Sequence, residues 1–144
     1  MAKQRVITLQ EIEFVAYRLA KQKLMFDEPI PDFSTRYPDK LESCLAMPFM
    51  RIAGKDCYPS FVDKASMLFY LMIKNRPFKN GNKRIAITTL LVFMLSNNKW
   101  IKVNQMEFYN FTIWVASSPA MLKDATVKGI KDFIGKYMVD VEKS

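Results

Sequence analysis

Histidine is absent from the 144 residues of the chain. Neither a histidine base nor a histidine metal ligand can therefore come from this chain. The two cysteines, Cys44 and Cys57, lack the CxxC spacing of zinc and redox motifs, so we expect free structural thiols in a reducing cytosol. These two absences make a zinc site and any histidine-dependent mechanism poor interpretations of the sequence.

Glycine and proline are scarce, at 4 and 7 residues, whereas 50% of the residues are hydrophobic. This composition excludes a disordered, collagen-like or low-complexity chain. No apolar run approaches the roughly 18 to 20 residues that cross a bilayer, and the polar start MAKQR lacks the apolar core of a signal peptide. We expect a single cytoplasmic domain over residues 1–144 with no membrane partner.

Basic residues outnumber acidic ones by 22 to 14, which gives a formal net charge of +8. This balance suits an anionic partner such as a nucleic acid, a nucleotide, an acidic protein or a membrane surface, and it does not choose among them. Lysines near the C-terminus alternate with acidic residues, which indicates a solvated helix face and makes a nucleic-acid partner the weaker interpretation. A nucleic-acid binder would show affinity that falls steeply with salt.

Apolar residues recur at helical spacing along most of the chain and predict an all-α fold. The predicted helices cover about residues 9–26, 39–47, 61–75, 85–95, 104–117 and 119–141. The segment 85–95 (IAITTLLVFML) is almost wholly apolar, so we expect it to be the buried central helix. The predicted fold is a compact bundle of about six or seven helices around that segment.

Two segments carry further local signals. Residues 8–11 (TLQE) form a capping box that starts the first helix, whose apolar stripe includes Ile12, Val15 and Ala16. Residues 47–60 contain two prolines, a glycine and no lasting periodicity, which predicts a loop and a candidate lid.

The densest charge lies in residues 74–84 (KNRPFKNGNKR), where five cations occur without an acid. This run joins a helix end to the start of the central helix, so Gly81, Asn82 and Lys83 would present free N–H groups at a helix N-terminus. Cations there oppose the helix dipole, so stability alone does not explain them. We interpret the run as a phosphate site, with Arg84 as a bidentate ligand and Phe78 as a core anchor.

The residues of this run carry a resemblance to a known family. Residues 77–84 (PFKNGNKR) resemble the Fic/Doc signature H-P-F-x-[D/E/N]-[G/A]-N-[G/K]-R, in which eight of the nine positions match and only Arg76 departs. Residues 9–20, 39–48 and 60–75 also resemble the helices that precede the signature in Doc-like proteins. The resemblance covers about residues 7–100 and implies the Fic/Doc-like helical fold.

The resemblance implies transfer from ATP, or another nucleoside triphosphate, with Mg²⁺ to a hydroxyl side chain of a target protein. Fic members mostly transfer a nucleoside monophosphate, whereas the Doc branch, with a lysine at the position of Lys83, resembles kinases that act on elongation factor Tu. The chain therefore resembles a Doc-like toxin, with a separate antitoxin protein as a further partner. The loop at about 50–59 would be the flap that aligns the target.

Site roles follow by position in the resembled signature. Asn82 and the neighbouring N–H groups, Gly81 included, would form an anion hole. Three cations of the run would hold the phosphates, namely Lys79, Lys83 and Arg84. Asn80 would occupy the metal-side position, where a neutral amide holds Mg²⁺ more weakly than the carboxylate of many relatives.

Arg76 stands where the family has its general-base histidine. A guanidinium has no free acceptor at neutral pH, so it cannot take a proton from an attacking hydroxyl, and we expect an inactive enzyme. Three explanations remain open: an inactivating change in a toxin, a natural non-catalytic protein that binds a nucleotide or a partner, and a substitute base such as Glu107 or Asp56. Transfer of AMP remains the alternative to transfer of phosphate.

Overall fold

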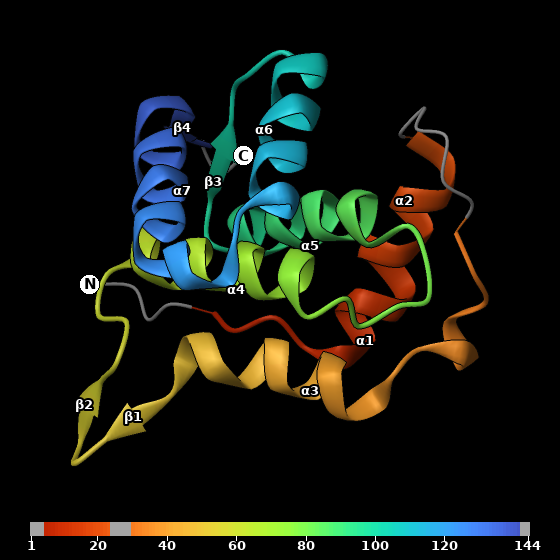
Figure 1. The fold of residues 1–144 in the computed structure, drawn as a ribbon, viewed down its shortest axis with the longest axis horizontal. Helices are drawn as coiled ribbons and strands as arrows, with labels where there is room; N and C mark the ends of the chain where they lie inside the picture. The colour runs from red at the N-terminus through yellow and green to blue at the C-terminus, as the bar shows by residue number, and fades with distance from the viewer. Residues whose placement is uncertain (1–4, 24–29, 142–144) are drawn as a thin grey trace.

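The computed structural model describes residues 5–23 and 30–141. Helices dominate them, as Figure 1 shows. The α-helices are α1 Leu9–Glu11, α2 Tyr17–Lys23, α3 Pro38–Ala46, α4 Phe61–Lys74, α5 Asn82–Ser96, α6 Gln105–Ser117 and α7 Lys123–Tyr137. Shorter helical segments are η1 Ile12–Ala16, η2 Phe33–Thr35, η3 Met47–Phe49 and η4 Ala120–Leu122. The all-α class predicted from the sequence is confirmed.

The predicted central helix is α5, which begins three residues before the apolar run and ends at Ser96. It packs against α4, α2, η1, α6 and the strand β3 (Lys99–Ile101). Its β-branched residues form a helix and not a strand, and all of them except the partly buried Val92 are buried by these neighbours. In α4, ten consecutive residues, Lys64 to Ile73, are buried, so this helix is also covered on more than the one face that its periodicity indicates.

The first helix begins at the predicted capping box. The Glu11 amide donates to Thr8 Oγ1 over 3.2 Å, and the Thr8 amide donates to Glu11 Oε1 over 3.0 Å. The π-helical segment η1 then widens one turn and rotates the residues that follow. Val15 is 42% exposed as a result, so its predicted place on the buried stripe is wrong. The predicted helix end near residue 26 lies outside the described residues.

Two short antiparallel ribbons were not predicted. Strands β1 Arg51–Ile52 and β2 Lys55–Asp56 form a hairpin inside the predicted loop 47–60. Its turn residues Ala53 and Gly54 have φ of 52° and 77°, the two positive values that a type I′ turn requires. The second ribbon includes the residues after α7, so the helix predicted over residues 119–141 is wrong beyond Tyr137.

The second ribbon pairs β3 Lys99–Ile101 with β4 Met138–Asp140. It joins the segment after α5 to the segment after α7, so these two ends lie side by side (Figure 1). Met138 and Val141, which fall within the helix predicted over residues 119–141, therefore lie in and after a strand. Two further backbone hydrogen bonds flank the ribbon, from the Lys102 amide to the Tyr137 carbonyl and from the Val141 amide to the Asn98 carbonyl, each over 2.9 Å.

Both cysteines are free. Cys44 lies buried in α3, and burial raises the pKa of its thiol to about 11, so it is neutral and structural, as predicted. Cys57 is exposed just after β2, so the prediction of a structural thiol is wrong for this residue. No helix within the described residues has the length and apolar character needed to span a bilayer.

Candidate functional site

The basic run forms the connection from α4 to α5. Helix α4 ends at its C-cap Asn75, and Arg76 follows with a φ of 48° before Pro77. A left-handed residue followed by proline is a common way to end a helix, although glycine or asparagine usually takes that position. The side chain of Arg76 is exposed. The local backbone thus turns at the position that distinguishes this chain from the resembled signature.

The middle of the connection is anchored in the core, as predicted. The Phe78 side chain is 1% exposed, and its ring lies 6.2 Å from the Tyr17 ring and 5.8 Å from the Phe33 ring, measured between centroids. The Asn82 side chain closes the turn, because its Oδ1 accepts from the Phe78 amide over 2.9 Å and its Nδ2 donates to the Phe78 carbonyl over 2.8 Å. The amide side chain of Asn82 therefore holds the loop and is not directed at a ligand.

Gly81 is the N-cap residue of α5. Its φ of 70° and ψ of 16° are left-handed, which glycine adopts without the steric penalty of a Cβ. Its amide donates to Oδ1 of Asn80 over 3.1 Å. The prediction that the Gly81 N–H is free is therefore wrong, because the side-chain oxygen of the neighbouring Asn80 accepts from it, as polar side chains do at helix starts.

A cleft of about 290 Å³ opens beside this connection. It is lined by Ile73, Lys74, Arg76, Asn82, Lys83 and Ala116. Three of these side chains carry positive charge and none carries negative charge, so the cleft suits an anion. The structure thus brings three predicted residues, Arg76, Asn82 and Lys83, to one place.

The sequence did not indicate the wall of the cleft that α6 supplies. The Lys74 Nζ donates to the carbonyl oxygens of Ala116, over 3.2 Å, and of Ser118, over 2.5 Å. This lysine caps the end of α6 and ties it to the end of α4. In the sequence Lys74 is one of the five cations of the basic run, and in the structure its ammonium holds the end of α6 so that Ala116 lines the cleft.

The other predicted ligands lie outside the cleft lining. The Arg84 side chain is 8% exposed, and its Nη1 donates to the Ala20 carbonyl over 3.0 Å. Lys79 is exposed, and Asn80 uses its Oδ1 for the Gly81 amide. Phosphate binding by Lys79 and Arg84 and metal binding by Asn80 remain predictions.

Neither proposed substitute base lies in the cleft lining. Glu107 accepts a hydrogen bond from the Tyr137 hydroxyl in the first turn of α6, nine residues and about 13 Å along the helix from Ala116. Asp56 lies on the hairpin and pairs with Arg51 and Lys64. The described residues also contain no group of three Cys, Asp or Glu side chains that could hold a metal ion.

The hairpin expected as a flap lies at the other end of α4. It contacts the N-terminal part of that helix, whereas the connection with the cleft follows the C-terminal end (Figure 1). Helix α4 has 14 residues, which is about 21 Å of helix. In this structure the hairpin therefore does not cover the cleft.

Loss of the Asn82 side chain is expected to destabilise the connection. Asn82→Ala leaves two buried backbone groups of Phe78 unpaired, which lowers the free energy of unfolding by about 2–4 kcal/mol. Asn82→Asp keeps an acceptor for the Phe78 amide and loses the donor, so we expect a smaller loss. Urea titration of both variants measures the difference, and equal stability of Asn82→Ala and the parent chain would contradict the clamp.

Comparison with known proteins gives one match to a family model. The family model of the Fic/DOC family matches residues 7–94, which is more than half of the chain. No curated protein and no solved structure matches the chain. The matched region runs from the strand-like entry before α1 through most of α5, and it includes the connection and all but one of the residues that line the cleft. The chain belongs to the Fic/DOC family.

Proposed function

We propose that the chain is a Doc-like toxin whose cleft binds ATP and whose family reaction, the transfer of a phosphoryl group to a hydroxyl of a target protein, is blocked by Arg76. The observation that carries the proposal is the meeting of Arg76, Lys83 and the start of α5 in one cationic cleft. A helix start and lysine charge favour phosphate oxygens. Transfer of AMP by the same cleft is the alternative.

The donor groups of the cleft fit a nucleoside triphosphate with Mg²⁺. Positive side chains complement the phosphates, and the absence of a carboxylate from the cleft lining means that the phosphates themselves would supply most ligands of the metal ion. Mg²⁺ bound there would neutralise charge on the transferred group. Asn80 could contribute its amide oxygen, because one lone pair remains after this oxygen accepts from the Gly81 amide.

Arg76 is the reason for the proposed block of group transfer. In the transfer, the hydroxyl oxygen of the target bonds to phosphorus, the bond from phosphorus to the leaving phosphate oxygen breaks, and a base takes the hydroxyl proton. Arg76 lines the cleft at the position of that base, and its guanidinium is protonated and has no acceptor. The protein can still bind nucleotide, which also supports a non-catalytic binding function as the second candidate.

Calorimetry with ATP and Mg²⁺ tests the nucleotide site. We expect saturable binding to the parent chain and an affinity about tenfold lower for Lys83→Met, because the charge-assisted contact is lost from the cleft lining. Lys128→Met is the matched control, since Lys128 is exposed on α7 and pairs with Asp132. Absence of binding, or equal affinity of the two variants, would contradict the site.

The partners follow from the same proposal and have their own test. A toxin of this kind acts on a cytoplasmic target such as elongation factor Tu and is restrained by an antitoxin protein. Expression of Arg76→His should arrest growth of the host, and co-expression of an antitoxin protein that binds the chain should relieve the arrest. Normal growth on expression of that variant would count against the toxin proposal.

A further inference from the structure

The ammonium group of Lys64 is buried near the start of α4. Its side chain is 7% exposed, in the first two turns of the helix. Lysine is almost never buried to this degree unless it is paired, and a cation near a helix N-terminus opposes the helix dipole. Helix stability therefore does not explain this residue, and neither does the distant cleft.

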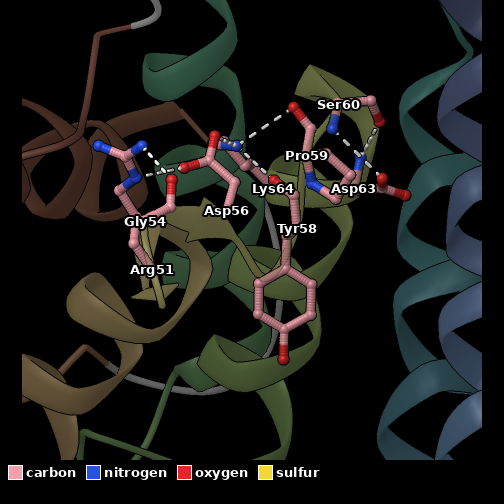
Figure 2. A network of polar contacts seen from close by, with 8 residues as sticks. All are labelled: Arg51, Gly54, Asp56, Tyr58, Pro59, Ser60, Asp63 and Lys64. Carbon is pink, nitrogen blue, oxygen red and sulfur yellow. Dashed lines mark hydrogen bonds and ion pairs between the residues drawn. The ribbon is translucent and has the colours of Figure 1, made fainter.

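Three acceptors surround the Lys64 Nζ, as Figure 2 shows. It donates to Asp56 Oδ2 over 3.1 Å, to the Tyr58 carbonyl, and to the Pro59 carbonyl over 3.4 Å. An ammonium has three donors, so the set is complete. All three acceptors belong to β2 or to the segment that returns from the hairpin to α4.

The hairpin has few other means of holding its position. Two residue pairs form its ladder, one further backbone hydrogen bond joins the Cys57 amide to the Met50 carbonyl over 3.0 Å, and every residue of β1 and β2 is exposed. An isolated two-stranded hairpin is marginally stable at best. Asp56 extends the anchor across the ladder, because its Oδ1 lies 3.1 Å from Arg51 Nε. The other contacts that hold the chain near the hairpin lie outside the ladder: Phe49 packs on Phe93 before it, Tyr58 packs against the core after it, and the capping box at Ser60 and Asp63 belongs to α4 itself.

We infer that Lys64 is a buried latch that fixes the β1–β2 hairpin at the N-terminal end of α4. When the latch opens, the hairpin moves independently while the core of α4 and α5 stays folded. Asp56 is partly exposed, so water can solvate its carboxylate after release, which confines the effect to the hairpin. This inference does not depend on nucleotide binding at the cleft.

Hydrogen exchange and limited trypsin digestion of the full chain test the latch. Lys64→Met keeps the apolar stem and removes the charge. We expect amide exchange in residues 50–59 and cleavage after Arg51 and Lys55 to be about tenfold faster or more, with unchanged exchange in residues 85–96. Asp56→Asn should give a smaller acceleration in the same segment, because the two carbonyl contacts of Lys64 remain.

Lys131→Met is the matched control. Lys131 Nζ lies 2.8 Å from Asp63 Oδ1, so this variant removes another lysine–carboxylate pair at the same helix end without touching the hairpin. We expect hairpin exchange at the parent rate. Parent-like hairpin exchange in Lys64→Met, or equal acceleration in Lys131→Met, would overturn the inference. If Lys64→Met does not fold, Asp56→Asn decides: faster exchange confined to the hairpin supports the latch, and an unchanged rate overturns it.

Discussion

Arg76→His is expected to raise the rate of group transfer from ATP to protein by about 10²- to 10⁴-fold, the usual contribution of a general base. The imidazole can accept the proton of the attacking hydroxyl, which the guanidinium of Arg76 cannot do. The position already lines the cleft with Asn82 and Lys83, so the base would stand beside the site proposed for phosphate. ATP labelled at the α or the γ phosphate, supplied with a cell extract, measures transfer and shows which group moves.

The pH profile separates a base from a simple loss of positive charge. Neutral imidazole is the active form, so the rate with histidine should rise as pH increases through the pKa of the imidazole, ordinarily about 6.5, and then level off. The parent chain should show no such step. Arg76→Asn is the control, because it removes the cation without supplying a base. Equal activity of the asparagine and histidine variants would contradict a base at this position.

Folding should tolerate both variants. Position 76 has a φ of 48°, and asparagine and histidine enter the left-handed region more readily than arginine does. The side chain is exposed, so no core contact is lost. A change of activity in these variants can therefore be attributed to chemistry in the cleft and not to unfolding.

Local signals predicted the helices well. The capping box at Thr8, the apolar run of α5 and the proline after Arg76 each have a direct physical effect on the backbone, and each is found where expected. The ribbons have no such signal. The β3–β4 ladder joins residues about 40 positions apart, and it is the packing of α5 and α7 against α4 that brings these segments together.

The part of the candidate site that depends on local sequence was predicted, and the part that depends on long-range contacts was not. The cations and Gly81 are local features of one connection, and the structure brings Arg76 and Lys83 to the cleft. The α6 wall depends on the contact of Lys74 with carbonyls 42 and 44 residues away, which no pattern in the sequence indicates. Arg84 also makes a contact that the motif does not indicate, since its Nη1 donates to a carbonyl of α2, while phosphate binding by this residue stays a prediction.

Removal of the Phe78 ring should weaken both the fold and the site. Phe78→Ala is expected to lower the free energy of unfolding by about 3–5 kcal/mol, because the ring is 1% exposed and packs against Tyr17 and Phe33. Phe78→Leu retains most of the apolar volume and should lose less. Denaturant titration followed by circular dichroism measures both values.

A matched core variant shows whether the ring serves the site in particular. Phe93 is 0% exposed and packs against Phe49 and Phe61, so Phe93→Ala should lose a similar free energy. Asn82 binds the backbone amide and carbonyl of Phe78. Loss of the ring leaves this backbone without its anchor in the core and loosens the connection beside the cleft. At a temperature where both variants are folded, ATP affinity should fall for Phe78→Ala and stay at the parent value for Phe93→Ala. Equal affinities would mean that the anchor stabilises the core without shaping the cleft.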